Sequence, residues 1–163
     1  MSCNESQDHV HVLPEDDDNL RLANGFLLGL PERVRRQFFV RRVAGGWGKV
    51  LDQFESVHIG QMNDINTRFM ILLIDFDDKG EERFARARSV IPQHLIDRVF
   101  ILGAKKEPRD LKAAGLGAYE EIGKALAADC HYGTNETWGH PQLQHNGEEL
   151  ERLRRRVRPF LFQ

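Results

Sequence analysis

Hydrophobic and polar positions alternate along the chain with two different periods, one typical of strands and one typical of helices. Apolar runs of about four to eight residues that are bounded by Gly, Pro or acidic residues indicate β-strands, whereas apolar residues three or four positions apart indicate amphipathic helices. The expected strands span residues 9–13, 37–43, 68–76 and 97–102. The expected helices span residues 19–30, 47–57, 81–91, 118–128 and 148–157, and the segments 61–66, 112–117 and 129–146 are expected to be loops and turns.

Strands and helices follow one another in turn, which predicts a sheet covered by helices. The run at residues 68–76 is the most apolar in the chain, and such a run is typical of a parallel strand buried on both faces. The expected fold class is α/β: a Rossmann-like, open, mainly parallel four-stranded sheet with helices on both faces and a C-terminal helical extension. A chain of 163 residues, with 40% hydrophobic and 29% charged residues, fits one globular domain. Within it, we expect the α/β core at about residues 8–110 and the helical extension at about 111–163.

Composition argues against several classes of protein. The longest apolar runs are far shorter than the roughly 20 residues of a membrane-spanning helix, so no membrane association is expected. The first residues lack the basic start and the apolar stretch of a secretory signal, which predicts a cytoplasmic location. Cys3 and Cys130 have no second cysteine at metal-ligand spacing, so neither a disulfide framework nor a cysteine zinc site is expected.

The formal net charge of −2 averages two opposite concentrations of charge. Residues 15–18 are all acidic, whereas arginines crowd the C-terminal helix and the residues after it. Arg154, Arg155 and Arg158 lie either on a solvated helix face or on a surface for phosphates or for an acidic partner, and the sequence favours neither interpretation. The apolar residues 160–162 predict docking of this segment against the domain or against another subunit of a homo-oligomer.

Acidic residues follow two of the expected strands. Glu15 comes after the first strand, and Asp75 and Asp77 end the third. Side chains two residues apart in an extended strand point to the same side, so Asp75 and Asp77 are expected to face one way. Ligands of an open parallel sheet bind outside the carboxyl ends of its strands. If the first and third strands are neighbours, these three carboxylates are therefore expected together at a binding site.

A cluster of carboxylates repels itself unless a cation lies within it. Mg²⁺ and Mn²⁺ are hard ions that take oxygen ligands, so we expect Glu15, Asp75 and Asp77 to bind one of them. The other acidic residues of the same rim have a second interpretation as helix N-caps, which bind the free amides at the start of a helix. These residues are Asp16, Asp17, Asp18 and Asp78.

Three short motifs stand in a fixed order. Glu15 follows the first strand in the segment 10–15, a glycine-containing turn follows the second strand at 43–46, and an Asp-X-Asp pair ends the third in the segment 71–77. This order resembles the TOPRIM domain of type IA and type II topoisomerases, primases, OLD-family nucleases and small stand-alone relatives. The resemblance covers about residues 8–110.

The resemblance implies a reaction at a phosphodiester that depends on Mg²⁺ or Mn²⁺, as in a nuclease or in the nuclease-type subunit of a larger complex with an ATPase. Glu15 would act as the general acid/base or as a metal ligand, and Asp75 and Asp77 would coordinate the metal. OLD-type relatives place a lysine near the site, and Lys105 or Lys106 would take that role or else lie in a solvated turn. The implied partners are nucleic acid, DNA foremost, and an ATPase protein.

Two other functions fit the same residues. In one, the chain is a TOPRIM-like module without catalysis, which works only inside a complex. In the other, the chain resembles a receiver domain, with Asp75 as the phosphoacceptor and Asp16 or Asp17 holding magnesium. A receiver places a hydroxyl residue after its fourth strand, whereas this chain has Gly103 and Ala104 there and no clear fifth strand.

Overall fold

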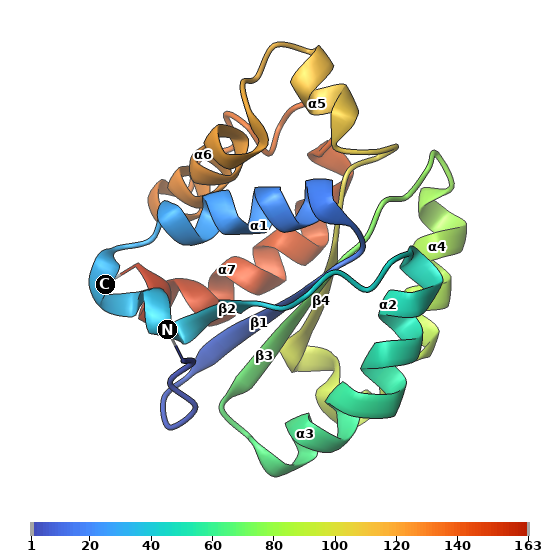
Figure 1. Ribbon diagram of the computed structural model, residues 1–163, viewed down its shortest axis with the longest axis vertical. Coiled ribbons are helices and arrows are strands. Elements are labelled where there is room, and N and C mark those ends of the chain that lie inside the picture. The colour runs from blue at the N-terminus through green and yellow to red at the C-terminus, as the bar shows by residue number, and fades with distance from the viewer. Residues whose placement is uncertain (1, 163) are drawn as a thin grey trace.

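The structure is a computed structural model that describes residues 2–162. Its centre is one sheet of four parallel strands in the order β2-β1-β3-β4 (Figure 1). The strands are β1 (His9–Pro14), β2 (Phe38–Val40), β3 (Arg68–Leu73) and β4 (Val99–Leu102). Helices lie on both faces, so the structure confirms the expected open α/β, Rossmann-like fold.

Helices from distant parts of the sequence form the two outer layers (Figure 1). The first layer consists of α1 (Asp17–Leu28), α6 (Tyr119–Tyr132) and α7 (Gly147–Leu161). The second consists of α2 (Trp47–Gln53), α3 (Ile59–Asp64) and α4 (Gly80–Ser89). Short helical segments connect them: η1 (Glu32–Gln37), the π-helical η2 (Phe54–His58), η3 (Gln93–Arg98), α5 (Arg109–Ala113) and η4 (Gln144–Asn146).

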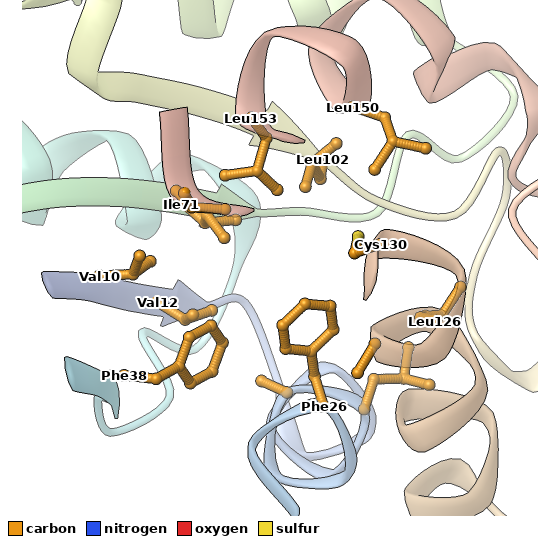
Figure 2. Close-up of a cluster of buried hydrophobic side chains, with 14 of the residues drawn as sticks. Val10, Val12, Phe26, Phe38, Ile71, Leu102, Leu126, Cys130, Leu150 and Leu153 are labelled. Carbon is orange, nitrogen blue, oxygen red and sulfur yellow. The ribbon is translucent and has the colours of Figure 1, made fainter. Parts of the chain in front are cut away.

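Alternating side chains of the strands divide the core into two layers. Val12 of β1 faces α1, α6 and α7, and Figure 2 shows Phe26 and Leu153 pointing from these helices toward the same side of the sheet. Met70 of β3 belongs to the other layer, where it is buried together with Phe54. Phe54 lies in η2, which connects α2 and α3. Burial on both faces explains why β3 is apolar along nearly its whole length.

Helices α1 and α6 touch backbone to backbone. A Cβ atom on Gly25 would lie 2.2 Å from the carbonyl oxygen of Glu120, and one on Gly123 would lie 2.2 Å from that of Leu22. Only a residue without a Cβ atom permits this approach. The contact fixes α6 alongside α1, although the two helices are far apart in the sequence.

Side chains, instead of another strand, cover the outer edge of β4. Glu149 of α7 accepts a hydrogen bond from the Ile101 N–H at 3.1 Å. Asn146 accepts one from the Gly103 N–H at 3.1 Å and donates one to the Gly103 carbonyl at 3.0 Å. These bonds satisfy the backbone groups that would otherwise invite a further strand.

Several boundaries differ from the prediction. The strands expected at 37–43 and 68–76 end earlier, at Val40 and Leu73, because the chain leaves the regular strand geometry at the carboxyl edge of the sheet. The loop expected at 61–66 is helical as far as Asp64, since η2 joins α2 and α3 into one helical segment. The loop expected at 129–146 begins only after Tyr132.

The final residues that the structure describes pack against the first core layer. The Phe160 ring centre lies 5.8 Å from that of Phe69, and the Phe162 ring centre lies 6.3 Å from that of Phe26. These contacts match docking against the domain, one of the two positions expected for this segment. None of the helices in residues 2–162 is both long and apolar enough to cross a membrane.

Candidate metal centre

Glu15 follows β1 directly and is held by its backbone from both sides. Its N–H donates to the Leu73 carbonyl of the neighbouring β3 at 2.9 Å. Its carbonyl accepts from the N–H groups of Gly45 and Gly46 at 2.8 and 3.2 Å. Gly45 and Gly46 have φ angles of 94° and 150°, which residues other than glycine rarely adopt. The glycine turn after β2 therefore fixes where the Glu15 side chain starts.

The Glu15 side chain reaches across to the segment that follows β3. Its Oε2 atom accepts a hydrogen bond from the Asp75 backbone N–H at 2.6 Å. β1 and β3 are neighbours, with Pro14 paired to Leu73, so the residues after the two strands meet at one edge of the sheet. The sequence predicted this meeting of Glu15 and Asp75, provided that the strands were adjacent.

Asn19 of α1 links Asp75 to a third carboxylate, Asp16. The Nδ2 group of Asn19 donates to Asp75 Oδ1 at 2.8 Å and to Asp16 Oδ1 at 3.0 Å. Asp16 is also the N-cap of α1, because its side chain accepts from the Asn19 backbone N–H at 3.0 Å. One residue thus fills both roles that the sequence left open, as a cap and as a member of the acidic cluster.

Glu15, Asp16 and Asp75 each offer an oxygen atom, and these atoms lie within 4.8 Å of one another. Asp75 is only 8% exposed. The pKa of Asp75 is raised to about 8, chiefly by burial and also by the charges of Asp16 and Glu15, against the opposing hydrogen bond from Asn19. Burial likewise raises the pKa of Glu15. Burial and the neighbouring carboxylates therefore disfavour the charged forms of Asp75 and Glu15 in the chain by itself.

Arg83 of α4 is a cation that lies beside this group, yet it binds the backbone of Asp75. Its Nη1 atom donates to the Asp75 carbonyl oxygen at 2.6 Å, and its Nη2 atom lies 3.6 Å from Asp77 Oδ2. The guanidinium group lies 4.7 Å from the ring centre of Trp47, which supports it from the side. The charge of Arg83 lowers the pKa of Glu15, but less than burial raises it.

The structure places Asp77 differently from the expectation. Asp77 and Asp78 have φ angles of 49° and 57°, so the chain turns here instead of continuing as a strand. The prediction that Asp75 and Asp77 face the same way is therefore wrong, because its two-residue period applies only to extended chain. The Asp77 side chain is 57% exposed and stands at the rim of the group, where it pairs with Arg83.

Lys105 and Lys106 stand at the same rim as this turn. Their carbonyl oxygens accept hydrogen bonds from the N–H groups of Asp78 at 2.9 Å and Asp77 at 3.1 Å. Both lysines are exposed, and the structure gives neither of them an ion pair within residues 2–162. Their charged ends are thus exposed and free of ion pairs with the residues that the structure describes.

The remaining acidic residues of the rim lie outside the carboxylate group. Asp17 is exposed, and Asp18 accepts a hydrogen bond from the Tyr119 hydroxyl at 3.3 Å. Asp78 precedes α4, but the N-cap of α4 is Lys79, and no side chain caps that helix. The cap interpretation therefore holds for Asp16 and not for Asp78.

Sequence reasoning missed Asn19 and Arg83. Asn19 shares a helix face with Leu22, Ala23 and Phe26, so a polar residue on an apolar stripe was a signal that it binds something inside the fold. Its full burial agrees with that signal. Arg83 carried no local signal, because its contacts depend on how α4 packs beside the turn after β3.

Arg154, Arg155 and Arg158 lie on the far part of α7, away from the carboxylates. α7 begins near the carboxyl end of β4 and runs toward the opposite end of the sheet (Figure 1). Its last turn packs near Phe69, at the beginning of β3. The structure thus does not bring these arginines together with Glu15 and Asp75.

Because comparisons with known proteins give no match, a function for this site has to be argued from its chemistry. The described part of the chain offers three carboxylates, an orienting amide and a rim of cations. No family model, no curated protein and no solved structure matches this chain.

Proposed function

We propose that this chain binds Mg²⁺ or Mn²⁺ at Glu15, Asp16 and Asp75 and carries out metal-dependent cleavage or transfer at a phosphodiester of a nucleic acid. One observation carries the proposal: three converging carboxylates, two of them with raised pKa values, meet at the carboxyl ends of adjacent parallel strands. Ligands of open α/β sheets bind at this edge. A dication there would offset the repulsion from Asp16 and Glu15, which adds to burial in raising the pKa of Asp75.

The donor atoms fit a hard metal ion. All three side chains of the group offer carboxylate oxygen, and Mg²⁺ commonly takes one or two carboxylates together with waters and phosphate oxygens. Sulfur and imidazole, which favour softer metals, are absent from this group. The hydrogen bond from Asn19 holds two of the carboxylates in place, as a partner of metal ligands should.

The chain's own residues have distinct roles in this proposal. A bound metal would stabilise charge on the phosphate and lower the pKa of an attacking water. Glu15 lies beside Asp75 and would serve as a ligand or take a proton from that water. Lys105 and Lys106 at the rim, together with Arg83, would attract the phosphate. The motif order that resembles a TOPRIM domain supports this assignment and belongs to the proposal.

A receiver-like function is the second candidate, because the strand order 2-1-3-4 also occurs in receiver-type doubly wound sheets. In that case Asp75 would accept a phosphoryl group. The Asp75 carboxylate is buried and hydrogen-bonded to Asn19, which favours a ligand over an exposed acceptor. Incubation with acetyl phosphate separates the two, since only a receiver would form an acyl phosphate at Asp75.

The test compares thermal unfolding with and without Mn²⁺ or Mg²⁺ in the wild type, in Asp75→Asn and in Asp17→Asn. Asp17 is an exposed neighbouring acid outside the group, so its variant is the matched control. We expect metal to raise the Tm of the wild type and of Asp17→Asn but not of Asp75→Asn. A wild type without any metal-induced shift would overturn the proposal.

The same samples are then incubated with plasmid DNA, single-stranded DNA and RNA. Metal-dependent cleavage that is lost in Asp75→Asn supports the enzyme. Metal-induced stabilisation without cleavage of any substrate favours the module without catalysis, which would need a partner such as an ATPase.

A further inference from the structure

A groove of about 610 Å³ lies at the end of α7 that is remote from the carboxylates. Its lining is Gly133, Glu151, Arg154, Arg155, Arg158, Pro159 and Phe162. The three arginines come from one side of α7, and another side of this helix is buried in the first core layer. The metal proposal uses none of these residues.

The charge of the groove is positive and largely uncompensated. None of the three arginines forms an ion pair within residues 2–162, and Glu151 is the single acid in the lining. Arg154 is oriented by hydrogen bonds to the Thr134 carbonyl at 2.6 Å and to Asn135 Oδ1 at 3.1 Å. Arg155 and Arg158 are exposed. The groove therefore suits an anionic ligand.

Aromatic rings stack beside these arginines. The His131 ring centre lies 4.3 Å from that of Tyr132 and 5.2 Å from that of Phe162, with angles of 23° and 14° between the ring planes. Phe162 lines the groove, and Tyr132 ends the stack with 69% of its surface exposed. A flat ligand group can add to such a stack at Tyr132.

The groove lies far from the candidate metal centre. Tyr119, the first residue of α6, hydrogen-bonds to Asp18 near the carboxylates, whereas Tyr132 is the last residue of the same helix. A helix of 14 residues is about 20 Å long. A ligand that reaches both places must therefore span about 20 Å.

We propose that this groove binds single-stranded nucleic acid, with phosphates at Arg154, Arg155 and Arg158 and a base stacked on Tyr132. Arginines that follow a backbone and an exposed aromatic ring beside them are the usual elements of single-strand binding. A duplex offers its phosphates but no free base face, and an acidic peptide offers charge without a group for the stack. This inference deepens the proposed function, on which it rests for the fate of the bound strand, by naming that substrate as single-stranded.

The experiment measures fluorescence anisotropy of a labelled oligodeoxythymidine, about 20 nucleotides long, over a series of salt concentrations in EDTA. In the double variant Arg155→Ala/Arg158→Ala, we expect the slope of log K against log salt to fall by about 1.4, since each phosphate contact contributes about 0.7 for single strands. The matched control is Arg86→Ala, which removes an exposed arginine of α4 and should leave the slope unchanged.

The aromatic contribution is tested separately. Tyr132→Ala should weaken binding about ten-fold with an unchanged salt slope, and Tyr132→Phe should bind like the wild type. An unchanged slope in the arginine variant, or equal competition by a duplex of the same length, would overturn the proposal. Equal competition by polyglutamate together with no effect of Tyr132→Ala would overturn it in favour of an acidic protein partner.

Oligonucleotide binding measured in EDTA tests the groove independently of the metal site. In EDTA, Asp75→Asn should bind the oligonucleotide as tightly as the wild type, because Asp75 is not part of the groove. Loss of the metal-induced Tm shift would then leave strand binding intact. Loss of strand binding in the arginine variant would leave the metal-induced shift intact.

Discussion

In each of two groups of side chains in this molecule, three atoms that could bind a metal ion lie within 4.8 Å of one another. The charge around one group is negative and the charge around the other is positive. Glu15, Asp16 and Asp75 form one group at the carboxyl edge of the sheet, whereas Cys3, His9 and His11 form the other around the beginning of β1. At the second group, the guanidinium groups of Arg68 and Arg41 already contact the ring nitrogens of His9 and His11. At the first, the Arg83 guanidinium binds the Asp75 carbonyl oxygen instead.

The histidine group is surrounded by arginines. Arg68 Nε donates to His9 Nε2 at 3.1 Å, and Arg41 Nη1 lies 3.2 Å from His11 Nδ1. The pKa of His11 is lowered to about 2, chiefly by burial and also by the charges of Arg68 and Arg41. The same positive charges oppose a metal ion. Proximity of ligand atoms is thus insufficient to define a metal site, and the sign of the neighbouring charge separates the two groups.

The largest effect is expected from removing the cation of the histidine group. Arg68 is 2% exposed and binds Glu5 at 2.7 Å, Gln61 at 3.0 Å and His9. Arg68→Met leaves these polar partners without their donor and should lower the free energy of unfolding by about 3 kcal/mol, measured in urea. Arg86→Met, at an exposed position, is the control and should change it by less than about 0.5 kcal/mol. Equal stability of the two variants would mean that Arg68 is not needed to organise the histidine group.

The next effect concerns the orienting amide of the carboxylate group. Asn19→Ala removes the donor that holds Asp16 and Asp75, so we expect Mn²⁺ affinity to fall at least about ten-fold in calorimetric titration. The free energy of unfolding should fall by about 2 kcal/mol. Asn24→Ala on the same helix is the matched control, since the Asn24 side chain forms no hydrogen bond with a carboxylate in residues 2–162. Similar Mn²⁺ affinities in the two variants would show that Asn19 does not position the ligands.

The pH dependence of stability should distinguish the two groups by the sign of its slope. The folded pKa of Asp75, about 8, lies above its ordinary value of 3.8, so between these values the folded state holds a proton that the unfolded state has lost. Stability from this group is therefore complete below about pH 4 and is lost as pH rises toward 8. Asp75→Asn, or added Mn²⁺, should remove this decline in urea unfolding at a series of pH values.

His11 and His58 should give the opposite slope. Their folded pKa values, about 2 and about 4, lie below the ordinary 6.5, so the unfolded state binds protons that the folded state does not. Their contribution is complete above pH 6.5 and is lost as pH falls through their folded values. His11→Asn should make the acidic limb shallower, with the part that His58 contributes remaining, and should leave the alkaline limb unchanged. A variant that flattens both limbs would show that the two groups are coupled.

The sequence was sufficient to predict the sheet and the meeting of two of the three carboxylates, Glu15 and Asp75. Alternating strands and helices predicted the parallel sheet, and parallel strands end at the same edge, so Glu15 and Asp75 were expected to meet. Asp77 was misplaced because the apolar residues Ile74 and Phe76 prolong the strand pattern beyond Leu73, where the strand actually ends. The run Asp-Asp-Lys-Gly that follows was the missed signal, since aspartate tolerates the left-handed backbone.

The contacts that complete the group depend on tertiary packing. Asn19 reaches Asp75 across 56 positions of sequence, and Arg83 reaches the Asp75 carbonyl from a helix on the other face of the sheet. No local period encodes such meetings. The arginines that occupy the histidine group are hidden for the same reason, because Arg68 and Arg41 come from different strands or strand ends than His9 and His11.

The smallest effect is expected from Cys3→Ser, which directly tests whether the histidine group binds a metal ion. Cys3→Ser changes one potential ligand of the histidine group and none of the carboxylate group. Since Arg68 and Arg41 already supply positive charge there, Zn²⁺ or Mn²⁺ should shift the Tm of Cys3→Ser and of the wild type by the same amount. A Zn²⁺-induced shift that disappears in Cys3→Ser would show that a metal binds the histidine group despite the two guanidinium groups. The sign of the neighbouring charge would then not separate the two groups. An equal shift in Cys3→Ser that disappears in Asp75→Asn would assign metal binding to the carboxylate group alone.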